Sequence, residues 1–253
     1  MASFFDLFLH RRTVRRWRKA ARDAPTVSLT TLKAQRTRAR QLRAHIDRLI
    51  HVADGRLALP RIDSSQFQKP HGTDWAWRPE AWRGPLTKPG LAAVPTRAPF
   101  GNEATLFHDC DVSEVTLRQI RNLRPDDLAA FGLRLDVFRF DGSFLSLVID
   151  LPNDAAKGLS RSNLIRVNTI IESEKPLEIF ARLNVRHGPN TEQVVRELPL
   201  HEEDVSVDFD LAYSKLNERR IEKVWLDLIF EAPEMNQIIL RDVTFARYMR
   251  ASI

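Results

Sequence analysis

The sequence has little cysteine, with one such residue among 253. Cys110 has no second thiol in the chain, so an intrachain disulfide and a thiolate metal cluster are excluded, and a reducing compartment fits this composition. No apolar run approaches the about 20 residues that a membrane-spanning helix needs, and residues 4–9 are too short for the apolar region of a signal peptide. We therefore expect a soluble or peripheral protein.

Local motifs of common enzyme classes are also missing. No G-x-G-x-x-G, P-loop, G-x-S-x-G or H-E-x-x-H pattern occurs, so nucleotide, nucleophile-elbow and zincin chemistry have no local support. The run His108-Asp109-Cys110-Asp111 offers metal-ligand types, but alternate residues of an extended chain point to opposite faces, so at most two of them can meet one ion. We assign no catalytic residue, no metal and no cofactor, and expect a binding protein rather than an enzyme.

Positive charge is concentrated at the N-terminus. Residues 1–51 hold 13 Lys or Arg against three Asp, a net charge of +10, whereas the remaining residues hold 26 basic and 30 acidic side chains, a net charge of −4. The sequence predicts a basic amphipathic helical arm over residues 1–55, with a second helix that begins near Thr26 or Ser28 and ends near His51.

The arm joins an aromatic tip to a ladder of arginines. This pattern suits docking onto an anionic membrane surface or into a groove on a protein partner, while nucleic-acid phosphate would satisfy the same charges and a solvated terminal segment would need no partner. The candidate contact residues are Phe4, Phe5, Phe8, Arg11, Arg12, Arg15, Arg16 and Trp17.

Residues 56–102 hold seven of the 14 prolines, which excludes long helices and central strands there. We expect an extended Pro/Trp-rich connector that runs over a surface. Trp75, Trp77 and Trp82 either attach this segment to the body of the protein or form a stacking platform for a sugar ring or a base, with Arg78 or Asp74 at its edge.

Residues 103–253 read as an antiparallel β-sandwich of the jelly-roll type. Leu133–Leu151 resembles a β-hairpin with a two-residue turn at Asp141-Gly142, a central second arm and a bulge between Val137 and Phe138, and a short helix is expected over Arg124–Phe131. Short strands recur without long helices between them, which is typical of a sandwich or barrel. The other expected strands are 104–108, 115–120, 164–171, 177–186, 193–198, 205–211, 221–230 and 238–248.

Residues 177–186 alternate most regularly, with apolar residues on one face and polar residues on the other. The polar row leads into the turn 187–190, at one end of the sandwich, where loops of such folds often bind ligands. A solvated face would show the same pattern. If the row binds a ligand, its donors suit hydroxyls or a carboxylate, and the candidate residues are Arg182, Asn184, His187 and Asn190, with help from Trp77.

Four runs carry a resemblance to known proteins: FHDCDVSEVTLRQIRN, DGSFLSLVIDLP, RLNVRHGPN and WLDLIFEAPEMNQIILRDV. They resemble an uncharacterised family of alphaproteobacterial proteins over roughly residues 70–253, a family of unknown function that implies no activity. The closing pattern, an apolar strand, Pro and Asn, then a strand that ends in Arg-Asp-Val, is also similar to galactose-binding-like jelly rolls.

The sequence therefore predicts a non-catalytic glycan-binding or attachment β-sandwich that is tethered by its basic arm. The alternatives are a structural subunit of a larger assembly, such as an envelope-associated or phage-like particle, and a polysaccharide-active enzyme. We expect a cytoplasmic protein, either peripheral to the inner membrane or part of a large particle. The expected partners are a protein or an anionic membrane surface at the arm, with a glycan and a homo-oligomer as candidates and nucleic acid less favoured.

Overall fold

The computed structural model describes residues 4–62, 67–200 and 203–250. Its internal contacts divide the chain into two units, Met1–Ala53 and Asp54–Ile253. The first unit contains helix α1 (Phe4–Asp23) and the first part of helix α2 (Leu29–Ile62), and the second contains all the strands. No helix in the described part of the chain is long and apolar enough to cross a membrane.

The start of helix α2 agrees with the sequence prediction, and its end does not. Ser28 Oγ accepts a hydrogen bond from the Thr31 N–H at 3.4 Å, as an N-cap does. The predicted end of α2 near His51 is wrong, because the helix continues to Ile62. Gly55 lies inside it; a single glycine costs a helix only about 1 kcal/mol, which is too little to end it.

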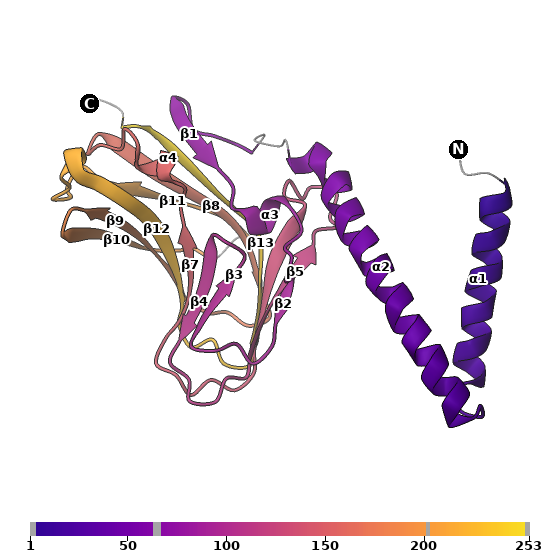
Figure 1. Cartoon of the computed structure of the whole chain (residues 1–253). Coiled ribbons are helices and arrows are strands. Elements are labelled where there is room, and N and C mark those ends of the chain that lie inside the picture. The colour runs from indigo at the N-terminus through magenta and orange to yellow at the C-terminus, as the bar shows by residue number, and fades with distance from the viewer. Residues whose placement is uncertain (1–3, 63–66, 201–202, 251–253) are drawn as a thin grey trace. The chain divides into compact units, whose positions relative to one another are not determined.

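The second unit is a sandwich of two antiparallel sheets, as the sequence predicts (Figure 1). The seven-stranded sheet has the order β11 (Asp204–Asp210), β8 (Asn163–Ser173), β13 (Asn236–Met249), β6 (Phe131–Val137), β5 (Val115–Arg121) and β2 (Gly90–Leu91), and β1 (Thr73–Trp77) also pairs with β13. The six-stranded sheet has the order β10 (Asn190–Glu197), β9 (Ile179–His187), β12 (Ile221–Phe230), β7 (Leu145–Asp150), β4 (Ala104–His108) and β3 (Arg97–Phe100).

The chain crosses repeatedly from one sheet to the other. The connections β4 to β5, β6 to β7, β7 to β8, β8 to β9, β10 to β11, β11 to β12 and β12 to β13 all change sheets, which is the jelly-roll manner of wrapping. The inner faces of both sheets share one core, to which β9 contributes Ile179, Ala181, Leu183 and Val185, all buried. The alternation expected for this strand is confirmed.

The hairpin predicted over Leu133–Leu151 is wrong in its pairing. β6 and β7 are both interior strands, and Leu147 and Ile149 are buried, but the two strands belong to different sheets. The segment between them is no tight turn. A Cβ on Gly142 would come within 2.5 Å of Asp109 Oδ1 and 3.0 Å of Cys110 Sγ, so this glycine permits close packing of two loops.

Two smaller expectations also fail. β6 ends at Val137, where a bulge was expected, and the register shifts in that sheet lie in β13 between Leu240 and Asp242 and in β1 between Thr73 and Trp75. No helix forms at 124–131; the connection from β5 to β6 is held by side chains instead. Asn122 Nδ2 donates to the backbone oxygens of Ala129, Phe131 and Arg241 at 3.1, 3.0 and 2.8 Å.

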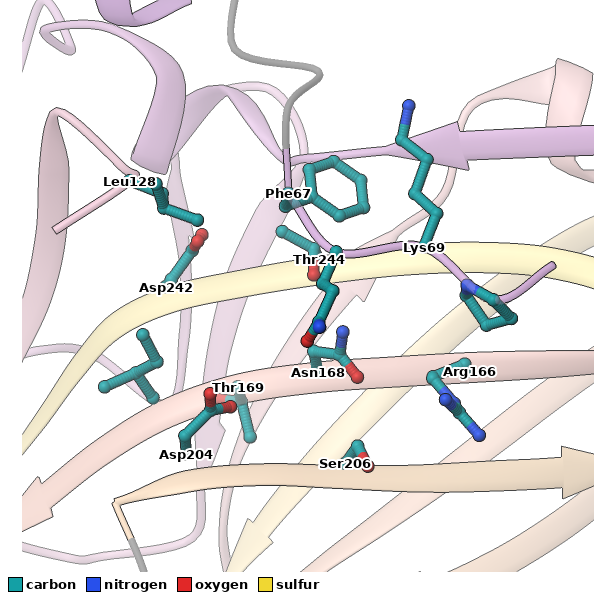
Figure 2. A pocket seen from close by; sticks show the side chains of 13 residues that line it. Phe67, Lys69, Leu128, Arg166, Asn168, Thr169, Asp204, Ser206, Asp242 and Thr244 are labelled. Atoms are coloured by element: carbon teal, nitrogen blue, oxygen red, sulfur yellow. The ribbon is translucent and has the colours of Figure 1, made fainter. Parts of the chain in front are cut away.

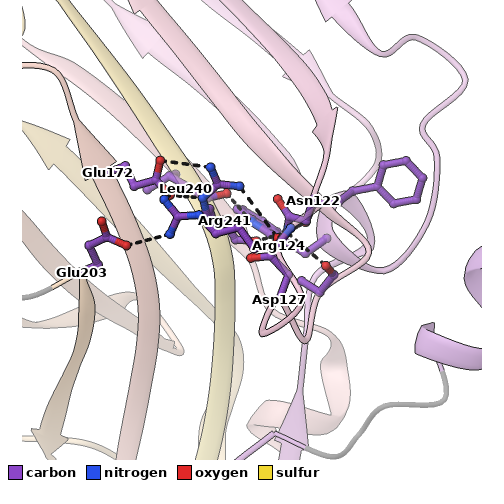
Figure 3. A network of polar contacts seen from close by, with 10 residues as sticks. Asn122, Arg124, Asp127, Glu172, Glu203, Leu240 and Arg241 are labelled. Carbon is purple, nitrogen blue, oxygen red and sulfur yellow. Dashed lines mark hydrogen bonds and ion pairs between the residues drawn. The ribbon is translucent and has the colours of Figure 1, made fainter.

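Ion pairs attach the same loop to β8 and β13, as Figure 3 shows. Arg124 pairs with Glu203 and Glu172, both at 2.8 Å, and Arg241 pairs with Glu172. The Arg124 N–H donates to Asp127 Oδ2 at 2.8 Å. The side chains of Asn122 and Asp127 thus bind backbone groups of this non-helical loop.

The segment 56–102, expected as a separate connector, supplies α3 (Glu80–Arg83) and the strands β1, β2 and β3 to the sandwich. Trp82 is fully buried and its Nε1–H donates to Leu240 O at 2.9 Å. Trp75 and Trp77 are half-buried and stack with ring centroids 6.4 Å apart. Attachment to the body, one of the two interpretations of these rings, therefore describes Trp82, and Trp75 and Trp77 also pack against the same core.

Candidate functional site

The outer face of the six-stranded sheet carries the candidate site. Since inward and outward side chains alternate, Arg182 lies on the face opposite the core, and the register places it beside Asp227 of β12. Asp227 in turn pairs with Val148 of β7. One step along the same face, Ile229 pairs with Ser146.

A groove of about 350 Å³ lies on this face. Four strands build it, since Phe107 comes from β4, Ser146 from β7, Arg182 from β9 and Asp227 from β12, while Phe144 directly precedes β7. The complete lining is Phe107, Phe144, Ser146, Val148, Arg182, Asp227 and Ile229.

Two of the residues that line the groove each have a buried polar atom without a partner in the described part of the chain. Asp227 is 3% exposed, and its Oδ2 accepts hydrogen bonds from Arg182 Nε at 2.8 Å and Asn184 Nδ2 at 3.1 Å. Its Oδ1, and Ser146 Oγ, are buried and make no hydrogen bond with any residue that the structure describes. A buried polar atom without a partner costs about 1–3 kcal/mol, so a ligand hydroxyl that reached these atoms would relieve that cost.

The walls of the groove are aromatic and apolar. Phe144 is 43% exposed and Phe107 is half-buried, with the Arg97 guanidinium 5.7 Å from the centre of the Phe107 ring. Sites for small ligands commonly combine such apolar planes with a few placed polar groups. The CH faces of a sugar ring suit Phe144 and Phe107, and its hydroxyls suit Asp227, Ser146 and Arg182.

Only one of the residues predicted to bind a ligand lines this groove. Arg182 does, and Asn184 lies next to it but is 1% exposed. Its amide donates to Asp227 and to Arg182 O, and its oxygen accepts from Gln193 Nε2 at 2.9 Å. Asn184 therefore positions Asp227 rather than facing solvent.

The other predicted residues do not join Arg182. The alternation of β9 places His187 on the face that points into the core, and its side chain is 4% exposed. Its Nδ1 accepts a hydrogen bond from the Asn217 N–H at 3.3 Å. Asn190 is exposed at the start of β10. Trp77 belongs to the other sheet, where it packs on Phe245 at 5.5 Å. The expected convergence of these side chains is wrong because alternation turns His187 inward and Trp77 lies in a different layer.

The sequence signals for the groove were present but were not recognised. Asp227 is the one charged residue in the apolar run 224–230 of β12, and burying a carboxylate there requires partners. Phe107 and Phe144 lie outside the inward alternation of their strands. What the sequence could not show is that these residues come together across four strands.

A second cavity, of about 530 Å³, lies on the outer face of the seven-stranded sheet (Figure 2). Lys69 and Phe67 lie over Asn168 and Thr244 there. Phe67 is 8% exposed, so it offers no stacking face. Polar side chains dominate the lining, and ion pairs hold two of its charged side chains.

Ion pairs occupy two of the charged side chains that line this cavity, Arg166 and Asp242. Arg166 donates to Asp208 from Nε at 2.8 Å and from Nη2 at 2.6 Å, and Arg78 binds Asp242 at 2.8 and 2.7 Å. Burial raises the pKa of Asp208, but the hydrogen bonds from Arg166 and Tyr248 outweigh it and hold that pKa below its usual value. We therefore place the candidate site in the first groove.

The side chains of the run 108–111 are mostly engaged in structure. His108 is fully buried, with Nε2 2.8 Å from Val94 O and Nδ1 accepting the Cys110 N–H at 3.1 Å. Asp109 accepts hydrogen bonds from the backbone and hydroxyl of Ser143. Among the described residues no group of three or more His, Cys, Asp and Glu side chains could hold a metal ion.

In the first unit, the predicted contact residues of the arm lie on α1. Arg11, Arg12, Arg15 and Arg16 are exposed, Phe8 is 59% exposed and Trp17 is half-buried. The side chains of Phe4 and Phe5 are outside the described part of the structure. Whether these residues contact a partner stays a prediction.

Comparisons with known proteins give a family and a set of similar structures. The model of a family of unknown function (DUF6478) matches residues 1–253, so the chain belongs to that family. No curated protein matches the sequence.

Three solved structures illustrate the similarities. A tailspike protein domain of bacteriophage CBA120 is 8% identical with a TM-score of 0.40; the match covers 56% of this chain and 19% of that one. A family 11 carbohydrate-binding module of Clostridium thermocellum is 10% identical with a TM-score of 0.39, over 66% of this chain and 97% of the module. A xylan-binding domain from Paenibacillus barcinonensis is 8% identical with a TM-score of 0.38, over 74% and 100%. Because these TM-scores are low, the functional proposal depends on the groove itself.

Proposed function

We propose that this member of the DUF6478 family binds a glycan chain in the groove on its six-stranded sheet. The observation that carries the proposal is that one groove combines two kinds of group. Its lining includes two residues with a buried polar atom that has no partner among the described residues, Asp227 (Oδ1) and Ser146 (Oγ), and the exposed ring of Phe144. A sugar supplies both hydroxyl groups and an apolar ring face, so one ligand would satisfy the floor and the wall together.

The groove supports binding better than hydrolysis. Glycoside hydrolysis ordinarily uses two carboxyl groups on either side of the scissile bond. Asp227 is the one carboxylate among the described residues that line the groove, and three hydrogen-bonded or ionic contacts from Arg182 and Asn184 hold its Oδ2. The proposal is therefore recognition without catalysis. In this proposal the sandwich binds the glycan, and the basic helices of the first unit attach the protein to its partner.

The aromatic wall gives the first test. Phe144→Ala should reduce affinity for a glycan about fivefold, because the loss of an aromatic contact of about 1 kcal/mol weakens binding by that factor. A glycan array on the full chain identifies a ligand, and calorimetric titration of the variant measures the loss.

Phe138→Ala is the matched control, because Phe138 is 53% exposed and does not line the groove. This variant should bind like the unmodified protein. An array without any hit, or equal affinities for both phenylalanine variants, would contradict the proposal.

The floor gives a second test that separates binding from stability. Ser146→Ala removes a buried hydroxyl that has no hydrogen-bond partner among the described residues, so the free energy of unfolding should stay unchanged or rise slightly. Glycan affinity should fall about two- to tenfold, the value of one hydrogen bond of about 0.5–1.5 kcal/mol. Urea unfolding and titration on the same sample measure both quantities. A stability loss without a change in affinity would show that the hydroxyl serves the fold.

A further inference from the structure

The helical unit presents a line of arginines on one face of α1. Arg11, Arg15, Arg18 and Arg22 follow one another at spacings of four, three and four, so they lie along one side of the helix, and all four are exposed. The unit as a whole holds 13 Lys or Arg against three Asp. Such a surface attracts a polyanion.

The same unit also exposes large apolar side chains. On α1, Phe8 is 59% and Leu9 is 45% exposed, close to the N-terminal end of the arginine line. On α2, Leu42, Ile46 and Leu49 are 37%, 44% and 67% exposed at spacings of four and three. These three form a stripe on one face of the helix.

Two residues earlier on that line of α2 are less exposed than the stripe. Leu32 and Ala39, which lie on the same line as Leu42, are half-buried. A cleft near the turn is lined by Trp17 of α1 and Gln35 of α2. The exposed apolar stripe therefore begins beyond these half-buried positions.

We infer that the helical unit docks onto the surface of an anionic lipid bilayer, which names the partner for the attachment half of the proposed function and rests on it. The arginine line meets the headgroup phosphates, and Phe8 and the α2 stripe enter the boundary between headgroups and acyl chains.

The exposed apolar residues decide between the candidate occupants. Nucleic acid would match the arginines, but its backbone offers no apolar medium for Phe8 and Leu49. A second copy would cover the apolar stripe, but it would bring together two units that each carry a charge of +10. An anionic bilayer satisfies both the charge and the apolar surface.

The experiment is sedimentation of the full chain with vesicles of phosphatidylcholine alone and of phosphatidylcholine mixed with phosphatidylglycerol. The protein should bind the mixed vesicles, and added salt should weaken the binding. Replacing Arg11, Arg15, Arg18 and Arg22 with Gln should weaken binding at least about tenfold, since each basic residue near an anionic surface strengthens the attraction.

A matched control removes the same charge from the sandwich. Lys88, Arg139, Lys215 and Arg219 are exposed, and replacing all four with Gln should leave vesicle binding unchanged. A triple Leu42→Ser, Ile46→Ser, Leu49→Ser variant should also bind more weakly, while it keeps the salt dependence.

Several results would overturn the inference. These are equal losses in the two Gln variants, absence of binding to the mixed vesicles, or tighter binding to a short nucleic-acid duplex that the arginine variant abolishes. Concentration-dependent dimerisation that the Ser variant abolishes would favour a second copy. Glycan titration of the arginine variant keeps the two proposals separate, because its affinity should be unchanged when only attachment is lost, whereas Ser146→Ala should bind vesicles normally.

Discussion

Replacing Trp82 with alanine should lower the free energy of unfolding by about 3–5 kcal/mol, the usual cost of emptying a buried tryptophan site. The indole is fully buried, and α3 holds it against β6 and β13. Its Nε1–H also donates to Leu240 O, so the substitution leaves that backbone oxygen without this donor. Urea unfolding followed by circular dichroism measures the change.

Trp75→Ala is the control for this experiment. Trp75 is half-buried and stacks on Trp77 at the surface of the same sheet. Its loss should cost no more than about half as much, since less apolar area leaves the interior. Equal costs for the two substitutions would mean that α3 is not an integral part of the core.

Replacing Arg78 with methionine should also cost about 3–5 kcal/mol, because it leaves a buried charge without its counterion. The Arg78 and Asp242 side chains are 4% and 9% exposed, and two hydrogen bonds of 2.8 and 2.7 Å join them. Arg186→Met is the matched control, since its partner Glu222 lies 3.0 Å away and both side chains are about half exposed. That surface pair should contribute at most about 1 kcal/mol.

The titration of Asp242 makes the free energy of unfolding depend on pH. Burial raises the pKa of this carboxyl even though Arg78 opposes the shift. A carboxyl with a raised pKa in the folded state favours folding when it is protonated, and that contribution is lost as pH rises through the folded-state pKa. Without Arg78 the pKa rises further, so the Arg78→Met variant should regain stability as pH falls from neutral.

The double variant Arg78→Met, Asp242→Asn completes this experiment. It removes both charges, so its stability should exceed that of the single Arg78→Met variant at neutral pH. Chemical unfolding at neutral and mildly acidic pH measures all three proteins. A single variant whose stability does not depend on pH, or a double variant no more stable than the single one, would contradict a buried ion pair at this position.

Much of the strand pattern was predictable from the sequence because it is local. The expected strand 104–108 and the expected strand 221–230 agree with β4 and β12 residue for residue. The period of two also identified the core face of β9. Side-chain alternation records which face is buried, and that information is present in each strand separately.

The pairing partners were not predictable in the same way. The dipeptide Asp141-Gly142 indicated a hairpin, yet β6 pairs with β5 and β13, and β7 pairs with β4 and β12. A strand with apolar residues can pair in either sheet, and the choice depends on contacts far apart in the chain. The short strands within residues 67–100 could not be predicted from the sequence for the same reason. Each of them pairs with a strand from a later part of the chain, and such short strands are not stable without that partner.

The sequence by itself determined the charge division between the basic helices and the acidic remainder, the β character of the larger unit and the inward face of its strands. Composition and periodicity are local properties of the sequence, so they can be read without knowing which segments are in contact. Only the tertiary structure decided that Phe107, Ser146, Arg182 and Asp227 share one groove while His187 and Trp77 lie elsewhere. Four strands separated by up to 120 positions meet there because long-range packing, and not local pattern, selects which strands lie side by side.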